Sequence, residues 1–438
     1  MKHKLRNWTY IRYVTYGVFI CLITLVLVLP ISTQDEEEGI TVDAEVTIAE
    51  VNPFAYGANF GPLSVVPVDF FEEAAASGIT FLRFPGGRWG DLNDITETQV
   101  DMYMRIVRLM DVEPSIHVRL ENGTPEAAVD LLNYANMEND YNIKYWYVGN
   151  EPNLFDDYTV EDHAEQWRAI AEALKTADPS ITLIGPDLSQ WNGTPQIDPT
   201  DPNGADWLRS FLRDNGDLVD VVSVHRYPFP LNQADPRTSI EDLRNNVTEW
   251  SNTLENLRQV IFEETGRDIP VAIAEASSHW SANVQGEATP DSHYNAIWWA
   301  DALGRLLEDE PYMVAYYELQ TPTNRGGWGL LGSFQIHPTY YVYQLYQRFG
   351  TAMVATTSSD ELVSVYAAKR EDGALTLIVI NLGDEASSTP LTINGFEGEV
   401  SEVRLLTEDT LAEVVENTVL VDGMLALPAQ SAALIVLE

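Results

Sequence analysis

The sequence predicts an α/β fold: a (β/α)8 TIM barrel, a C-terminal antiparallel β-sandwich domain and an N-terminal transmembrane or signal helix. Three observations lead to this prediction. From Phe54 to Gly350, short apolar runs alternate with longer amphipathic ones. After Gly350 the pattern changes to a two-residue alternation broken by turns. Near the N-terminus, the run Tyr13–Ile31 contains no charged residue.

The N-terminal apolar run is long enough to cross a membrane, because about 20 apolar residues in a helix span the hydrocarbon core. Basic residues precede Tyr13–Ile31 and the acidic run 35–38 follows it, so the basic side is expected in the cytoplasm. The alternative is a cleaved signal peptide, for which Ile31-Ser32-Thr33 could be the cleavage site. In both interpretations the rest of the chain is exported. It is anchored in the membrane at the cell surface if the segment is retained, and secreted if the segment is cleaved.

Eight strand–helix repeats are expected between residues 53 and 350. The expected strands are Phe54–Phe60, Thr80–Phe84, Pro114–Leu120, Lys144–Val148, Thr182–Pro186, Val219–His225, Pro270–Ala274 and Met313–Leu319. The expected helices are Val68–Ser77, Thr96–Met110, Pro125–Asn136, Val160–Ala177, Ala205–Asp214, Ile240–Thr265, Tyr294–Glu308 and Pro338–Phe349. Eight repeats match a closed barrel. An open doubly wound sheet is the weaker alternative, because no Gly-x-Gly-x-x-Gly phosphate loop is present.

The chain divides into four expected regions. Residues 1–39 hold the basic flank, the apolar segment and an acidic linker, and residues 53–350 form the barrel. Residues 351–438 form the β-sandwich, in which Glu371–Gly373 is expected to close a hairpin. Residues 40–52 contain the alternating stretch Ile40–Ile48, which we expect to cross back and join that sandwich.

The composition excludes several classes of function. With 67 Asp and Glu against 25 Lys and Arg, the net charge of −42 argues against a nucleic-acid partner, which would require a basic surface. A hydrophobic content of 45% argues against disorder. The single cysteine, Cys21, excludes an intramolecular disulfide framework and a multi-cysteine metal site. The oligomeric state is left open.

Two glutamates directly follow expected barrel strands, at the end where barrel enzymes carry their active sites. Glu151 follows strand four and Glu275 follows strand seven. Paired carboxylates across a cleft can hydrolyse a glycosidic bond, one as nucleophile and one as general acid and base. We expect Glu275 to be the nucleophile, kept ionised by Arg83 at the end of strand two, and Glu151 to be the acid/base. This chemistry needs no cofactor and no metal.

The segment Asn150-Glu151-Pro152 after strand four, with a Glu after strand seven, resembles clan A retaining glycoside hydrolases. The resemblance covers the whole barrel. It implies that Asn150 hydrogen-bonds a sugar 2-hydroxyl and that Arg83 and Tyr227 contact the nucleophile. The His225-Arg226-Tyr227 segment is similar to β-xylosidase, arabinofuranosidase and heparanase-like families. No single family has all these segments, so the clan and the mechanism are better supported than the substrate.

Further side chains at the expected barrel mouth could contact a sugar or simply pack within loops. Four tryptophans follow strands two, five, seven and eight and are candidate sugar platforms: Trp89, Trp191, Trp280 and Trp328. Asn59 and Asn122 could bind hydroxyl groups. His117 on strand three raises the possibility of a metal-dependent hydrolase, but no His-x-His pair accompanies it.

The substrate is expected to be a carbohydrate, and the acidic surface slightly favours neutral plant or microbial sugars over polyanionic chains. Salt screens that repulsion beyond about 8 Å. A uronic-acid substrate would need a cation in the site, for which Arg88, Arg119 and Arg325 are candidates. A non-catalytic sugar-binding protein on a decayed barrel is the competing hypothesis.

Overall fold

The computed structural model describes residues 39–231, 235–281, 285–321 and 327–438. The apolar helix expected at Tyr13–Ile31 lies outside these residues. Within the described ranges, every helix is too short or too polar to cross a membrane.

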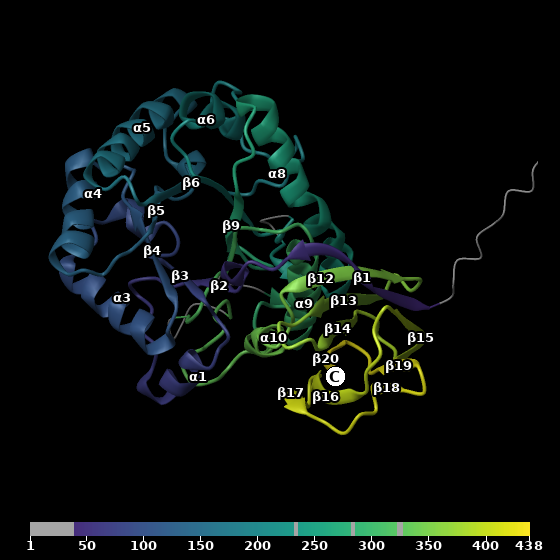
Figure 1. Ribbon diagram of the computed structural model, residues 1–438. Coiled ribbons are helices and arrows are strands. Elements are labelled where there is room, and N and C mark those ends of the chain that lie inside the picture. The colour runs from purple at the N-terminus through teal and green to yellow at the C-terminus, as the bar shows by residue number, and fades with distance from the viewer. Residues whose placement is uncertain (1–38, 232–234, 282–284, 322–326) are drawn as a thin grey trace, which may run out of the picture. The chain divides into compact units, whose positions relative to one another are not determined.

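Eight parallel strands close into a barrel in the order β11-β2-β3-β4-β5-β6-β7-β9 (Figure 1). Their bounds are β2 Gly57–Asn59, β3 Phe81–Phe84, β4 Glu113–Val118, β5 Tyr145–Val148, β6 Thr182–Leu188, β7 Val221–Arg226, β9 Val271–Ala276 and β11 Met313–Tyr316. The predicted closed barrel is therefore confirmed. The first strand is shorter than expected because Asn52 caps a 3-10 turn over Pro53–Ala55, which takes up part of the run.

Helices cover the outside of the barrel (Figure 1). Their bounds are α1 Phe71–Ala75, α2 Trp89–Leu92, α3 Glu97–Met110, α4 Pro125–Leu132, α5 Val160–Ala177, α6 Trp207–Asn215, α7 Ile240–Asn246, α8 Trp250–Thr265, α9 His293–Glu308 and α10 Pro338–Tyr346. The single helix expected over Ile240–Thr265 is wrong, because a 3-10 turn at Val247–Glu249 separates α7 from α8. Asn246, Val247 and Thr248 at that break all have low helix propensity.

The C-terminal region is a mostly antiparallel domain, but its strands form one curled ten-stranded sheet instead of two separate packed sheets. The sheet order is β17-β16-β20-β14-β13-β12-β1-β15-β19-β18. The bounds are β1 Ile40–Glu50, β12 Ala352–Ser358, β13 Val363–Lys369, β14 Leu375–Asn381, β15 Ser387–Asn394, β16 Val400–Leu406, β17 Leu411–Val414, β18 Leu420–Val421, β19 Met424–Leu427 and β20 Ser431–Leu437. Strand β1 pairs antiparallel with β12 and parallel with β15, so the stretch Ile40–Ile48 does lie in this sheet.

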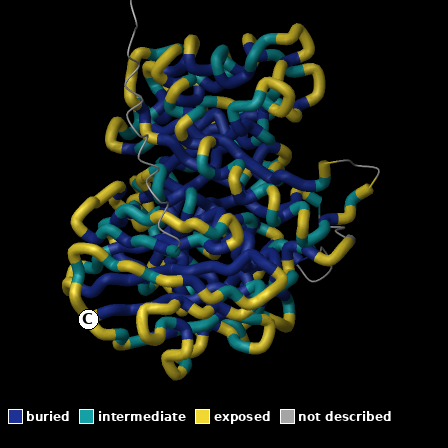
Figure 2. The backbone as a smooth tube through the Cα atoms, turned by 90° about the vertical axis from the view of Figure 1, so that its right-hand side faces the viewer, coloured by how far each residue is buried: buried dark blue, intermediate teal, exposed yellow. Residues whose placement is uncertain are grey.

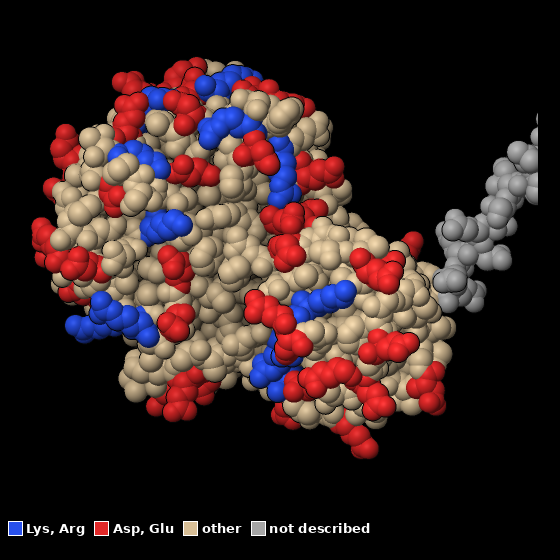
Figure 3. All heavy atoms as spheres, in the orientation of Figure 1, with Lys and Arg blue, Asp and Glu red and all other residues tan. Residues whose placement is uncertain are grey.

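Buried residues run through the interior of both parts, while exposed residues lie on the outer loops and helix faces (Figure 2). Inside the barrel, Phe81, Tyr145, Tyr147 and Ile184 belong to a small apolar cluster that fills the space below the mouth. Acidic side chains are scattered over the face shown in Figure 3, with fewer basic ones between them. The barrel mouth is therefore built on a packed interior, which holds the strand ends in place.

Candidate active site

Glu275 lies near the carboxyl end of β9 and is only 3% exposed. The β7–β9 pairing shifts register between Ile273 and Glu275, and such bulges commonly re-aim a side chain beside an active site. Glu275 Oε1 accepts hydrogen bonds from Arg83 Nη1 and from the Gly87 backbone N–H, both at 2.8 Å. Its Oε2 accepts one from the Tyr227 hydroxyl at 2.6 Å. Three donors thus fix the orientation of this carboxylate.

Arg83 is fully buried and links four side chains at the barrel mouth. Its Nη1 donates to Asn59 Oδ1 and Glu275 Oε1, each at 2.8 Å. Its Nη2 donates to Asn150 Oδ1 at 2.8 Å and to Asp187 Oδ2 at 2.7 Å. Burial opposes the charge, but Asp187 and Glu275 outweigh it and raise the pKa of Arg83, so the guanidinium stays a cation.

Glu151 directly follows β5 in a left-handed backbone conformation, with φ of 50°. Such a conformation is unusual for a residue with a side chain and is often found at functional sites. The Glu151 N–H donates to the Asp187 carbonyl oxygen at 2.9 Å, and the neighbouring Asn150 N–H donates to Asp91 Oδ2 at 2.8 Å. These bonds hold the loop so that the Glu151 side chain lies on the cleft, 16% exposed.

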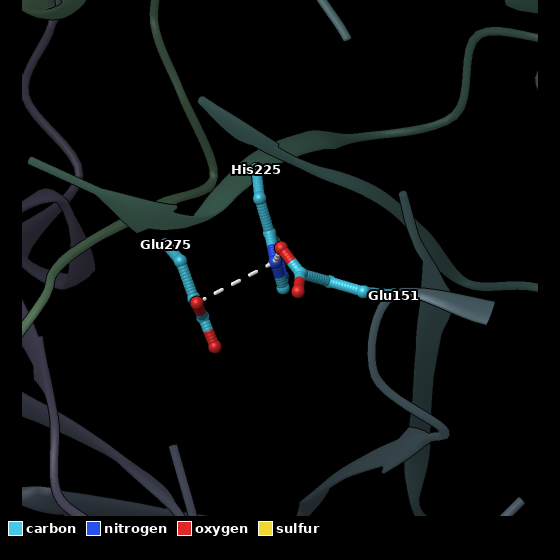
Figure 4. A group of neighbouring side chains, drawn as sticks. All are labelled: Glu151, His225 and Glu275. Atoms are coloured by element: carbon cyan, nitrogen blue, oxygen red, sulfur yellow. Dashed lines mark hydrogen bonds and ion pairs between the residues drawn. The ribbon is translucent and has the colours of Figure 1, made fainter. Parts of the chain in front are cut away.

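His225 lies between the two glutamates (Figure 4). Its Nδ1 is 3.2 Å from Glu151 Oε1 and 3.6 Å from Glu275 Oε2, and its Nε2 is 3.6 Å from Asp187 Oδ2. Burial alone would lower the pKa of His225, but the Glu275, Asp187 and Glu151 carboxylates raise it to about 10. The imidazole is therefore a cation at neutral pH.

The two glutamates open onto a cleft of about 560 Å³. Its lining also includes Arg88, Gln190, Tyr227, Trp280, Tyr317 and Trp328. Trp280 is 41% exposed, so a large part of its ring is free to contact a ligand. Of the candidate cations for a uronic acid, Arg88 reaches this lining, with its side chain 41% exposed and 3.6 Å from Glu121.

Other candidates from the sequence lie away from the cleft. Trp89 begins the short helix α2 and does not line it, and Trp191 is 2% exposed and lines a separate pocket. Asn122 sits in an exposed turn with φ of 56°. Arg119 donates to backbone carbonyls on its own side of the barrel, and Arg325 lies outside the described residues. Whether such a side chain reaches the cleft depends on how its loop packs, which the residue type does not reveal.

Asn59 lies beneath the site instead of facing the cleft. Its side chain is fully buried, accepts from Arg83 and donates to the Ala274 carbonyl oxygen at 2.9 Å. It therefore holds the arginine in place. Asn150 accepts from the same arginine, while its own Nδ2 has no partner among the described residues, which leaves a donor for a ligand.

Sequence reasoning missed three groups that contact the site. Asp187 is fully buried between Arg83 and His225, and it directly follows the run Thr182–Pro186 expected as strand five. The rule that selected Glu151 and Glu275, a carboxylate right after a strand, would have selected it too. The Gly87 backbone N–H and the Tyr317 side chain were also missed, and neither carries a recognisable signal in the sequence.

Glu151, His225 and Glu275 could geometrically hold a metal ion, since one potential ligand atom from each lies within 4.8 Å of the other two. The donor set does not suit one. A metal-bound histidine must present an unprotonated nitrogen, so at neutral pH a metal would have to displace the proton that the neighbouring carboxylates favour on His225. Both oxygens of Glu275 already accept hydrogen bonds, and Arg83 places a cation beside them. The arrangement is suited to proton transfer and covalent chemistry.

Comparison with known proteins agrees with this chemistry. The sequence model of the family described as "Glycosyl hydrolases family 39" matches residues 136–318, a range that includes both glutamates. The chain is 26% identical to alpha-L-arabinofuranosidase C of Emericella nidulans over 211 residues, and 33% identical to a probable alpha-L-arabinofuranosidase C of Aspergillus fumigatus over 213 residues. The chain resembles clan A glycoside hydrolases, as predicted.

The extent of this clan A resemblance differs between sequence and fold. Each of those two alignments covers 35% of this chain and 42% of the relative, so the chain spans less than half the length of these relatives. The fold is shared more fully. An alpha-L-arabinofuranosidase from Thermotoga maritima superposes with a TM-score of 0.73 at 18% identity, over 91% of this chain and 99% of the other. CelM2, a bifunctional glucanase-xylanase from a metagenome library, superposes with a TM-score of 0.69 at 18% identity, over 91% of this chain and 98% of CelM2.

Proposed function

We propose that this protein is a retaining glycoside hydrolase in which Glu275 is the nucleophile and Glu151 the general acid and base. The observation that carries the proposal is the spacing of the two carboxylates, whose nearest oxygens lie within 4.8 Å. Retaining enzymes place these groups about 5–5.5 Å apart, whereas inverting enzymes leave about 6.5–9.5 Å for a water molecule. The geometry therefore supports direct attack by a carboxylate.

The different surroundings of the two glutamates support the assignment of roles. Glu275 is held by Arg83, Tyr227 and Gly87, which favours a fixed anion aimed at one position. Glu151 is more exposed and its side chain contacts His225, which leaves it free to exchange a proton with substrate and water. A rigid nucleophile beside a more accessible proton donor is what double displacement requires.

The reaction then runs in two balanced steps. Glu275 attacks the anomeric carbon, the bond to the leaving oxygen breaks, and the proton of Glu151 passes to that oxygen. Glu151, now a carboxylate, takes a proton from water, whose oxygen attacks the same carbon and breaks the ester to Glu275. The sugar leaves with its original anomeric configuration, and both glutamates return to their starting states.

We propose α-L-arabinofuranosides as the substrate class, as fragments or side chains of neutral polysaccharides. The two fungal relatives and the Thermotoga structural neighbour, all of them alpha-L-arabinofuranosidases by name, support this choice. The scattered acidic surface is consistent with a neutral substrate, because it would repel a polyanion (Figure 3). β-Xylosides and β-glucosides are the next candidates, since the bifunctional glucanase-xylanase shares the fold.

The test is a panel of aryl glycosides covering arabinofuranosides, xylosides, glucosides, galactosides and glucuronides. We expect the arabinofuranoside to give the highest kcat/KM and proton NMR to show the retained anomer as the first product. An inverted first product would contradict the mechanism. Silence of the whole panel beside measurable oligosaccharide binding would favour a non-catalytic binding protein.

We also propose that the protein works outside the cytoplasm, held by its N-terminal apolar segment. The support is the uncharged run Tyr13–Ile31 with basic residues before it and acidic residues after it. After expression in a bacterium, carbonate extraction should leave the full-length chain in the membrane fraction. A soluble product whose N-terminus begins after residue 31 would show cleavage instead.

A further inference from the structure

Asp187 occupies a special position in the backbone. It lies in β6 where the pairing with β7 shifts register between Pro186 and Leu188, so Asp187 is the extra residue of a bulge. Its φ is 55°, in the left-handed region, which Asp tolerates better than most residues. A bulge turns a side chain away from the alternation of the strand. Here it brings a fully buried carboxylate to the barrel mouth.

The Asp187 side chain contacts the two cations of the site. Its Oδ2 accepts from Arg83 Nη2 at 2.7 Å and lies 3.6 Å from His225 Nε2, an ion pair too long for a direct hydrogen bond. Its Oδ1 accepts from the Ser223 hydroxyl. Burial alone would raise the pKa of Asp187, but Arg83 and His225 lower it to about 2. The side chain is therefore an anion at neutral pH.

Each of these contacts continues to one of the two reactive glutamates. Arg83 binds Asp187 through Nη2 and Glu275 through Nη1. His225 faces Asp187 through Nε2 and Glu151 through Nδ1. The Asp187 carbonyl oxygen also accepts the Glu151 N–H at 2.9 Å. Three connections from a single residue thus reach both sides of the cleft.

We propose that Asp187 is a positioning residue that sets the geometry of both glutamates and keeps His225 permanently protonated. The inference rests on the proposed function, since it assigns a role in that reaction. Asp187 does not touch the cleft, so it acts through Arg83 and His225. This role of Asp187 also distinguishes the functions of His225 and Glu151. Because the imidazole stays charged, it does not carry the catalytic proton, which moves through Glu151 alone.

The charges around His225 explain why one anion matters. Glu275, Asp187 and Glu151 face the ring, while Arg83 is the neighbouring cation that binds two of them. When Glu275 becomes an ester in the covalent intermediate, His225 loses one of its counter-anions. Asp187 remains, so the imidazolium persists beside Glu151, the group that must activate water.

The test compares Asp187→Asn with wild type by NMR titration of the His225 ring and by the pH dependence of kcat/KM. We expect the His225 pKa to fall in Asp187→Asn. The alkaline limb of the kcat/KM profile should then move to lower pH, because the site loses the imidazolium beside Glu151 at a lower pH. Loss of geometry should lower kcat by about 10²-fold, with a much smaller change in KM. Ser223→Ala is the matched control, because it removes a hydrogen bond to the same carboxylate but keeps its charge; His225 should titrate as in wild type.

An unchanged His225 titration together with a kcat close to wild type in Asp187→Asn would overturn the proposal. If Asp187→Asn does not fold, Asp187→Glu serves instead: its retained charge should keep His225 protonated while its greater length lowers kcat. A lowered His225 pKa in Asp187→Glu would then contradict the role of charge. If wild type cleaves no glycoside, the proposed function fails, while the NMR titration still decides whether Asp187 holds the histidine proton.

Discussion

The Nη1 atom of Arg83 lies 2.8 Å from Oε1 of Glu275, and the two side chains are 0% and 3% exposed. The other terminal nitrogen of the same guanidinium binds Asp187. One buried cation therefore balances two buried carboxylates. Removing one partner of a buried ion pair leaves an uncompensated charge, which costs about 3–5 kcal/mol.

Arg83→Gln should therefore affect stability and activity together. We expect the free energy of unfolding in urea to fall by about 3–5 kcal/mol, because Glu275 and Asp187 lose their shared cation. The kcat should fall as well, since the nucleophile loses a donor that orients it. The control is Arg213→Gln, whose side chain is 56% exposed and pairs with Glu264; exposed pairs contribute about 0–1 kcal/mol. Equal losses in both variants would contradict a special role for the buried pair.

Replacing each glutamate should give a different chemical rescue. Glu275→Ala removes the proposed nucleophile, so turnover should stop. Added azide should then attack from the vacated side and give a glycosyl azide of inverted configuration. Glu151→Ala keeps the nucleophile, so azide should intercept the covalent intermediate of an activated aryl glycoside and give the retained azide. Proton NMR of the two products distinguishes these outcomes.

An exposed carboxylate that is absent from the cleft lining provides the control for this experiment. Glu287→Ala alters an exposed residue, and its activity should remain that of wild type with or without azide. Wild-type activity in Glu275→Ala without azide would exclude Glu275 as the nucleophile. The retained azide from Glu275→Ala and the inverted one from Glu151→Ala would instead exchange the two roles.

Much of the barrel could be predicted because strand and helix periodicity are local properties. Helix α5 has the predicted bounds Val160–Ala177, since Thr159 and Asp162 form a capping box that marks its start. The β7–β9 bulge could not be predicted, because a register shift depends on how two strands pair. Strand seven was expected to end at Ala274, and β9 runs to Ala276, so Glu275 lies within the strand instead of after it.

The site could be predicted only where the residue type and its position at the end of a strand together indicate its chemistry. Glu151, Glu275, Arg83, His225 and Tyr227 do come together at the barrel mouth. Tryptophans in loops carry no such information: Trp280 reaches the cleft, whereas Trp191 is buried elsewhere. The sugar itself is decided by the shape of those loops, which composition and spacing do not encode.

The stability contributed by His225 should depend on pH with a definite sign. The folded-state pKa is raised to about 10 from an ordinary value of 6.5. Between these values the folded chain keeps a proton that the unfolded chain has lost, so the stability falls as pH rises. We expect the difference in free energy of unfolding between wild type and His225→Asn to be fully present below about pH 6.5. It should be lost as pH rises through about 10.

His163 provides a control of opposite sign for the same urea measurements. It is 1% exposed, and burial lowers its pKa to about 3. Below about pH 6.5 the unfolded chain binds a proton that the folded one does not, so the stability contribution of His163 should decrease as pH falls. Parallel pH trends for His225→Asn and His163→Asn would show that the carboxylates do not hold a charge on His225.

Trp280 should affect the binding of long substrates more than the chemical step. Its ring is 41% exposed on the cleft and is stacked on His279 with centroids 6.2 Å apart. An aromatic contact contributes about 0.5–1.5 kcal/mol, so Trp280→Ala should raise KM for an arabino-oligosaccharide by about twofold to tenfold. The kcat, and both constants for a small aryl arabinofuranoside, should stay near wild type.

Phe262→Ala, which removes an aromatic ring that is 66% exposed on α8 and absent from the cleft lining, is the matched control. A fall in kcat on both substrates with KM unchanged would show that Trp280 supports the reacting groups and does not form a sugar platform.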